Sequence, residues 1–357
     1  MEKTRLEKIL ESMKKHNFSQ LIISSPSAIF YLTGKWIESG ERMCTLFIND
    51  SGVKKLVINE LFPITDDIGF DIISFNDNED PIEKLAPFID GKVTLGIDKN
   101  WQSSFLIKLM DKIKGISVIN GSFIIDEVRI TKDDKEIQLL KAASIVNDRA
   151  MEELIKNISE GSKEINLARK LVDIYAKHGT EEFSFEPLIA FGKNGAEPHH
   201  SCDTSILKKG DSIIIDIGGK TNGYCSDMTR TVFCQEASER QKEIYNLVLK
   251  ANLAGIKAVK PGVKFSDIDK AARNVIANAG YGKYFTHRTG HNVGIDVHEP
   301  TDVSGVNNSE VREGMVFSIE PGIYLPKEFG VRIEDLVLVT KDGCEILNSY
   351  DKSMKIV

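Results

Sequence analysis

The stretch Ile213-Ile214-Ile215-Asp216-Ile217-Gly218-Gly219 sets an acidic residue inside an apolar, β-branched segment that ends in a glycine turn. Such residues favour strands, so Ser212–Ile217 is predicted to be a strand. A buried carboxylate without a partner is costly, and Asp216 alone could simply end an edge strand. A second acid, Asp227, follows eleven positions later, a spacing that lets a β-hairpin return it beside the first. Two like charges that meet in this way require a cation, unless Asp227 pairs with Arg230 instead.

Histidines are concentrated in two short segments. His287, His291 and His298 lie within twelve residues, among glycines that permit close backbone approach. With His199 and His200 they account for five of the seven histidines of the chain, which makes a chance distribution of core residues a weak explanation. We expect His291 to lie in a loop and to be a metal ligand.

Two further acids are embedded in β-rich motifs. Glu320 lies in Ser318-Ile319-Glu320-Pro321-Gly322-Ile323-Tyr324, and Glu334 lies in Val331-Arg332-Ile333-Glu334-Asp335. Either one alone could be a salt-bridged strand residue. Together with the two aspartates and one imidazole they form the oxygen-rich set that two divalent cations need to share and activate a water. The absence of a thiolate from this set favours Mn²⁺ over a structural Zn²⁺.

Length, composition and charge restrict the class of protein. A chain of 357 residues exceeds what one core usually organises, so two domains are expected. A formal charge of −7 with interleaved basic and acidic residues argues against nucleic acid as a partner. No apolar run approaches the roughly 18 residues of a membrane span, and the first residues are densely charged, so we expect a cytoplasmic protein without a membrane partner. The five scattered cysteines lack C-x-x-C spacing and are interpreted as reduced structural thiols.

The pattern of elements changes near residue 130, which predicts domains at 1–130 and 131–357. The first domain should be a small α/β unit, and the second should separate into helices and strands that carry the acids. Predicted helices are Arg5–Lys15, Lys132–Ile158, Glu164–His178, Ser238–Val259 and Ser266–Ala279, the last with Ser266 as its N-cap. Predicted strands are Gln20–Ser24, Thr45–Ile48, Lys55–Ile58, Lys92–Ile97, Ser212–Ile217, Thr229–Phe233, Val316–Glu320 and Val331–Val339.

These five motifs, in this order, resemble the creatinase/aminopeptidase P/prolidase family of dinuclear metallopeptidases. The resemblance covers nearly the whole chain and includes, more loosely, the stretch Ser25–Gly34 of the first domain. It implies a mixed α/β (α+β) protein, with a creatinase-like domain followed by a pita-bread catalytic domain. It also implies two divalent metal ions per subunit, with Mn²⁺ preferred over Co²⁺, Zn²⁺ or Fe²⁺. By this resemblance Asp216 binds one ion, His291 and Glu320 bind the other, and Asp227 and Glu334 bridge both.

The same resemblance gives roles to other residues. Glu320 would transfer a proton between the attacking water and the leaving nitrogen, His298 would stabilise the oxyanion, and His199 would contact the substrate near the scissile amide. His287, Tyr324 and Arg332 are expected to bind substrate. His200 departs from the commonest family pattern and is expected to line the pocket or support it.

The substrate implied by the resemblance is a small proline-containing peptide. Tyr324, Arg332 and the sizeable first domain favour Xaa-Pro cleavage over removal of methionine. Dipeptide-cleaving relatives often carry an arginine after the His-Glu pair, whereas this chain continues as Pro300-Thr301-Asp302 after Glu299. Arg288 or Lys193 could replace that arginine. We therefore expect an Xaa-Pro dipeptidase (prolidase), with aminopeptidase P as the alternative and a non-catalytic peptide-binding module as a remote one. A homodimer is also expected.

Overall fold

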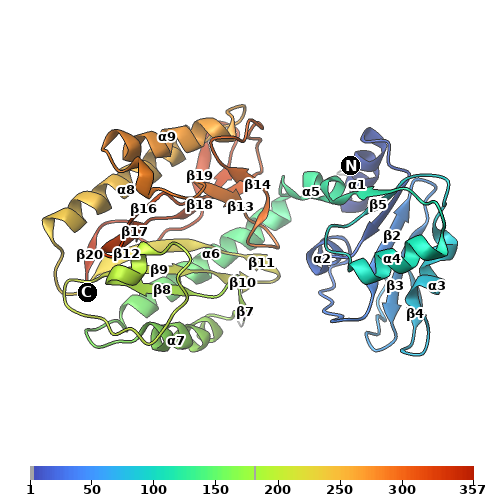
Figure 1. The fold of residues 1–357 in the computed structure, drawn as a ribbon, viewed down its shortest axis with the longest axis horizontal. Coiled ribbons are helices and arrows are strands. Elements are labelled where there is room, and N and C mark those ends of the chain that lie inside the picture. The colour runs from blue at the N-terminus through green and yellow to red at the C-terminus, as the bar shows by residue number, and fades with distance from the viewer. Residues whose placement is uncertain (1–3, 181) are drawn as a thin grey trace. The chain divides into compact units, whose positions relative to one another are not determined.

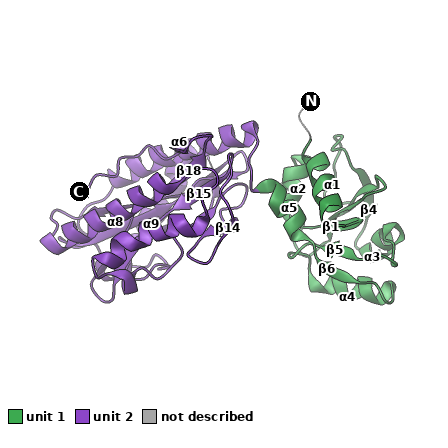
Figure 2. Cartoon of the chain, turned by 90° about the horizontal axis from the view of Figure 1, so that it is seen from above, with its two compact units in different colours: residues 1–129 green, residues 130–357 purple. Residues whose placement is uncertain are grey.

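The computed structural model describes residues 4–180 and 182–357, which form two units, Met1–Arg129 and Ile130–Val357 (Figure 2). The first unit is an α/β layer built on one six-stranded sheet, with strand order β4-β3-β2-β1-β5-β6. Its strands are β1 Gln20–Ile23, β2 Cys44–Asn49, β3 Lys54–Asn59, β4 Asp71–Phe75, β5 Leu95–Ile97 and β6 Val118–Asn120. Its helices are α1 Arg5–Lys15, α2 Pro26–Thr33, α3 Pro81–Leu85, α4 Ser103–Lys112 and α5 Ser122–Arg129, with a short 3-10 turn η1 at Ala86–Phe88.

The second unit contains four long helices and several small sheets. The helices are α6 Asp134–Ile155, α7 Glu164–Lys177, α8 Glu239–Ala258 and α9 Phe265–Asn278, with 3-10 turns η2 Gly192–Ala196 and η3 Gly282–Tyr284. The sheets have the orders β20-β12-β9-β8, β14-β13-β15-β18-β19, β11-β10-β7 and β16-β17. Their strands are β7 Glu182–Phe183, β8 Leu188–Phe191, β9 Ser212–Ile217, β10 Gly219–Thr221, β11 Tyr224–Cys225, β12 Met228–Phe233, β13 Gly290–Asn292, β14 Glu299–Val303, β15 Val316–Ile319, β16 Gly322–Leu325, β17 Phe329–Arg332, β18 Asp335–Val339, β19 Cys344–Ile346 and β20 Lys355–Ile356.

The core of the second unit lies between its helices and its sheets. Apolar side chains of α6 and α7, among them Met151 and Leu171, pack against Ile213 and Ile215 of β9. Helices α8 and α9 cover the other side of the strands (Figure 1). There Phe265 of α9 packs edge to face on Phe317 of β15, with ring centroids 5.3 Å apart. The strands that carry the acidic motifs are thus enclosed by helices on both sides, as expected for a rigid site.

Most predicted elements are confirmed, and the ends of helices show where local rules decide. Helix α6 begins after Asp133, whose carboxylate accepts from Glu136 N. The Glu136 carboxylate in turn accepts from Asp133 N, which completes a capping box. The predicted N-cap Ser266 is wrong. Helix α9 instead begins at Phe265 after Lys264, and Ser266 is buried within its first turn. Within the described residues, no helix combines the length and apolar character that crossing a membrane requires.

Candidate active site

The hairpin of β9 and β12 brings Asp216 and Asp227 close together. In its antiparallel register Asp216 lies opposite Thr229 and Ile217 opposite Met228, so Asp227 stands at the strand entry beside the end of β9. This confirms the predicted return of the chain. The alternative pairing of Asp227 with Arg230 is wrong, because the Arg230 guanidinium binds Asp335 at 2.8 Å.

The other sheet supplies the remaining predicted ligands. His291 lies in the short strand β13 and not in a loop, since Asn292 pairs with Phe317 of β15. Gly290 allows this approach, because a Cβ atom at that position would lie 1.8 Å from Ser318 O. Glu320 directly follows β15, and its backbone N–H donates to Thr289 O.

The predicted single strand Val331–Val339 is wrong in one respect. The segment forms two strands in two sheets, with β17 paired to β16 and β18 paired to β15. Glu334 lies in the break, and its N–H donates to Thr229 O at 3.1 Å, which turns the chain toward the hairpin. The break places this carboxylate among the other acids.

The predicted ligands converge around the imidazole. Asp227, His291 and Glu334 are all buried, and one ligand atom of each lies within 4.8 Å of the others. His291 Nε2 lies 3.6 Å from Asp227 Oδ2 and 3.5 Å from Glu320 Oε1. Asp216 is held at the edge of this group, with its Oδ2 accepting from Arg332 Nη2 at 2.7 Å.

The electrostatics of this group fit a cation. Burial, with the nearby Glu334 and Asp216 carboxyls, raises the pKa of Asp227 well above its ordinary value. Burial also raises the pKa of Glu320 to about 7 and lowers that of His291 to about 3. The His291 imidazole is therefore neutral at physiological pH and can coordinate a metal ion through a ring nitrogen. Asp216 Oδ1, Asp227 Oδ1 and Glu334 Oε1 are buried and have no hydrogen-bond partner. Three unpaired carboxylate oxygens beside one imidazole suit divalent metal ions.

A chain of hydrogen bonds leads away from the acids through Arg332. Its Nη1 donates to the Tyr324 hydroxyl at 2.9 Å, and that hydroxyl lies 2.8 Å from His287 Nε2. Burial lowers the pKa of His287 to about 3, and its Nδ1 lies 2.7 Å from Arg288 O. A neutral His287 therefore donates through Nδ1 and accepts the hydroxyl proton of Tyr324 at Nε2. The three predicted substrate residues thus form one connected group joined to Asp216.

The remaining predicted histidines border this group differently. His298 stacks edge to face on His291, with ring centroids 4.2 Å apart, and remains exposed. His199 is exposed too. Burial lowers the pKa of His298, and the neighbouring Arg288 lowers it further. His200 has a different partner, since its Nε2 lies 2.7 Å from Oε2 of the fully buried Glu164. Glu164 also accepts from Phe191 N and Asp203 N, so it orders the loop that carries His199.

Some residues of the site were missed from sequence. Thr229 donates its hydroxyl to Glu334 Oε2 at 2.7 Å and accepts from Arg332 Nε. Ser318 accepts from His291 N and contacts Glu320 Oε1 at 3.3 Å. Thr229 and Ser318 each lie two residues from a predicted ligand, so the alternation of strand side chains was a usable signal for both.

Comparison with known proteins agrees with this architecture. Residues 5–131 match the creatinase/prolidase N-terminal domain, and residues 138–341 match metallopeptidase family M24. The chain is 35% identical over 361 residues to a putative dipeptidase, YkvY, of Bacillus subtilis, which covers 99% of both chains. It is 34% identical to an Xaa-Pro dipeptidase of Pyrococcus horikoshii over 98% of both chains. A crystal structure of a dipeptidase from Pyrococcus horikoshii superposes with a TM-score of 0.94 at 35% identity, covering 99% of this chain and 100% of that one. The expected two-part fold is therefore confirmed, and the chain belongs to metallopeptidase family M24, with a creatinase/prolidase N-terminal domain ahead of the pita-bread domain.

Proposed function

We propose that this protein is an Xaa-Pro dipeptidase, or prolidase, that uses two divalent metal ions, with Mn²⁺ as the preferred metal. The observation that carries the proposal is the set of three unpaired, buried carboxylate oxygens around a neutral His291, joined through Asp216 to the Arg332–Tyr324–His287 chain. Full-length similarity to an Xaa-Pro dipeptidase supports the substrate class. We place Asp216, Asp227, His291, Glu320 and Glu334 as the metal ligands.

The protein residues around the metals divide the work of hydrolysis. When bound, the metal ions would lower the pKa of a water and polarise the scissile carbonyl. Glu320 would transfer a proton between the attacking water and the leaving nitrogen, because its Oε1 lies 3.5 Å from His291 Nε2 and therefore beside the proposed metal ligands. His298, beside His291, would donate to the developing oxyanion, and His199 would contact the substrate near the scissile amide.

The substrate carboxylate needs a cation in the absence of the arginine that often follows the His-Glu pair in relatives. Arg288 is exposed, and its charge acts on His298 and on Glu320, so it lies close to the reacting groups. We propose Arg288 as the clamp for the carboxylate of a dipeptide. Lys193, at the exposed surface of η2, offers the matched control.

Aminopeptidase P activity is the second candidate, because His298-Glu299 is followed by Pro300 and not by a clamping arginine. A longer peptide has no carboxylate near the scissile bond and would need no clamp. A non-catalytic peptide-binding module remains a third outcome. By family resemblance we also propose a homodimer, which a monomeric mass in solution would contradict.

The deciding experiment compares an Xaa-Pro dipeptide with an Xaa-Pro-Xaa tripeptide after chelation and after addition of Mn²⁺. Restored cleavage of the dipeptide alone supports a prolidase, and preference for the tripeptide supports aminopeptidase P. Glu320→Gln controls for a contaminating peptidase and should show no turnover. Arg288→Ala should raise KM for the dipeptide but not for the tripeptide, whereas Lys193→Ala should change neither. No cleavage of either peptide would reject both enzymatic proposals.

A further inference from the structure

A buried asparagine on helix α8 links the two glutamates of the candidate metal centre. Asn252 is fully buried, and its Nδ2 donates to Ile319 O at 2.9 Å and, at 3.4 Å, to Ile333 O. These carbonyls belong to the residues directly before Glu320 and Glu334. One side chain therefore bridges the two segments that present these carboxylates.

Both peptide groups are held at their other end as well. The N–H of Glu320 donates to Thr289 O at 2.8 Å, and the N–H of Glu334 donates to Thr229 O at 3.1 Å. Each peptide plane ahead of a glutamate is thus fixed through its oxygen by Asn252 and through its nitrogen by a backbone carbonyl of a neighbouring segment, Thr289 O or Thr229 O. Two fixed planes set the positions from which the two side chains project.

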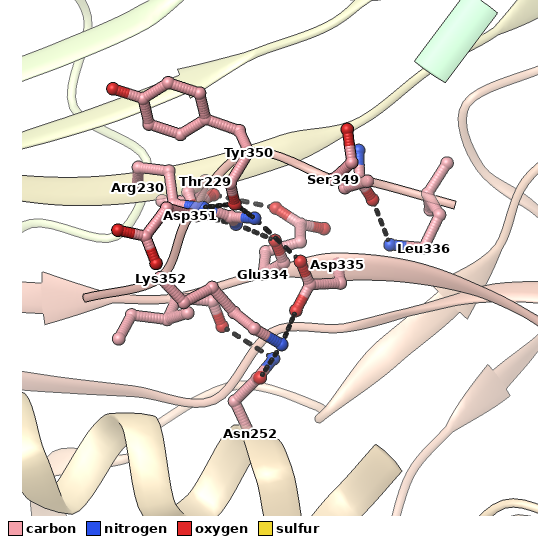
Figure 3. A network of polar contacts seen from close by, with 12 residues as sticks. Thr229, Arg230, Asn252, Glu334, Asp335, Leu336, Ser349, Tyr350, Asp351 and Lys352 are labelled. Atoms are coloured by element: carbon pink, nitrogen blue, oxygen red, sulfur yellow. Dashed lines mark hydrogen bonds and ion pairs between the residues drawn. The ribbon is translucent and has the colours of Figure 1, made fainter. Parts of the chain in front are cut away.

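The orientation of the Asn252 amide is set by its other partner. Lys352 Nζ lies 3.1 Å from Asn252 Oδ1 and 2.7 Å from Asp335 Oδ2 (Figure 3). An ammonium group only donates, so it must face the amide oxygen, which leaves Nδ2 to face the two carbonyls. Asp335 also binds Arg230, whose Nη1 donates to Glu334 O at 2.5 Å. Arg230, Asp335 and Lys352 therefore form a network of paired charges next to Glu334.

Close packing of the helix on the strand makes this bridge possible. A Cβ atom on Gly255 would lie 2.9 Å from Ile319 Cγ2, so a larger residue there would push α8 away from β15. Asparagine is short and reaches the carbonyls only if the helix lies this close. Two other buried asparagines act in a similar way, since Asn147 donates to Ile217 O and Asn348 to Asp227 O.

We infer that Asn252, oriented by Lys352, is a positioning residue that fixes the spacing of Glu320 and Glu334 and thereby the binding of two metal ions. The inference rests on the two-metal centre of the proposed function and not on the identity of the peptide substrate. It predicts that loss of the amide affects metal affinity, because partners behind a metal ligand typically change that affinity by about 10- to 100-fold.

The test is equilibrium dialysis of purified full-length protein against Mn²⁺, with thermal unfolding of the metal-free protein measured in parallel. The wild-type chain should bind two ions. Asn252→Leu should weaken at least one binding step by about 10- to 100-fold. Lys352→Met should weaken it less, because the amide loses its orientation but not its donor. The matched control is Asn59→Leu, since Asn59 is equally buried but its amide binds Asp77 Oδ1 and Leu61 N in the first unit.

The outcomes separate a positioning role from a merely structural one. Asn59→Leu should lower the melting temperature and leave Mn²⁺ affinity unchanged. An Asn252→Leu variant that melts early yet binds two ions with wild-type affinity would overturn the inference. If that variant aggregates, wild-type affinity in Lys352→Met overturns it instead. Two bound ions without Xaa-Pro cleavage would reject the proposed function alone, and a wild-type chain that fails to bind two ions would reject both.

Discussion

In the protein stripped of divalent ions, the folded state should become less stable as the pH rises from about 4.5 to about 7. The reason is Glu320, whose pKa is raised by burial from 4.5 to about 7. Below pH 4.5 the folded and unfolded states both hold this proton, and the raised pKa has no cost. Between these values the unfolded chain releases its proton while the folded protein keeps it, so unfolding becomes more favourable. Above pH 7 the full cost is present.

The size of the effect follows from the same pKa. At 1.36 kcal/mol per pKa unit, the rise from 4.5 to about 7 corresponds to about 3 kcal/mol of lost stability. Burial raises the pKa values of Asp227 and Glu334 as well, so both add a loss of the same sign. Bound cations should remove this cost, because they stabilise the ionised carboxylates.

Urea unfolding of chelator-stripped protein at pH 5 and pH 8 measures the effect. Glu320→Gln cannot ionise at this position and should lose roughly 2–3 kcal/mol less than the wild-type protein between pH 5 and pH 8, since part of the cost is already present at pH 5. Circular dichroism is dominated by the long helices of the second unit, whereas both tryptophans, Trp36 and Trp101, lie in the first unit, and their fluorescence provides an internal control. The reasoning is refuted if wild type and Glu320→Gln show the same pH dependence, or if Mn²⁺ at pH 8 stabilises neither.

Three further predictions test other parts of the structure. Lys132→Met should destabilise the second unit by about 3–5 kcal/mol in urea unfolding, because the Lys132 ammonium lies 3.0 Å from the equally buried Glu299 carboxylate. Adding Glu299→Gln should recover part of that loss, and an unchanged or deeper loss in the double variant would contradict a buried ion pair. Tyr324→Phe removes the hydroxyl that joins His287 to Arg332 and should lower kcat/KM for an Xaa-Pro dipeptide by roughly tenfold, a loss of about 1.4 kcal/mol; wild-type kinetics would exclude that hydroxyl from substrate binding. Burial raises the pKa of all five cysteines, so iodoacetamide at pH 7.5 should label none of them quickly in the native protein and all of them in urea, as counted by mass spectrometry; rapid native labelling would show an accessible thiolate.

The parts of the site that sequence predicted well are those set by local spacing. The sequence predicts a hairpin from an aspartate inside a β-branched run, a glycine turn and a second aspartate eleven residues on. Strands β9 and β12 form that hairpin. The run Val331–Val339 misled for the opposite reason. Its residues favour a strand throughout, and the break at Glu334 comes from a bond to Thr229, about a hundred positions earlier in the chain.

Long-range contacts also explain the residues that sequence missed or misplaced. Nothing near Asn252 in the chain indicates that it faces two carbonyls of residues more than sixty positions away, Ile319 and Ile333. An asparagine inside a helix is usually unremarkable. Ser266 illustrates the reverse case. Serine is a favoured N-cap, but the turn before α9 is fixed by backbone pairing of Lys264 with Glu310, so the N-cap is Lys264, two residues before Ser266.

The distribution of buried charge separates supporting acids from candidate ligands. Asp335 uses one oxygen for Arg230 and the other for Lys352, and both oxygens of Glu164 accept from nearby donors. In the described residues, the buried carboxylate oxygens that lack any partner belong to Asp216, Asp227 and Glu334. An unpaired buried carboxylate is costly, and a fold that pairs its other buried acids so fully has the means to pair these three. The three unpaired oxygens are therefore best explained by cations that bind them. The pH dependence of the metal-free protein measures how much stability is lost when those cations are absent.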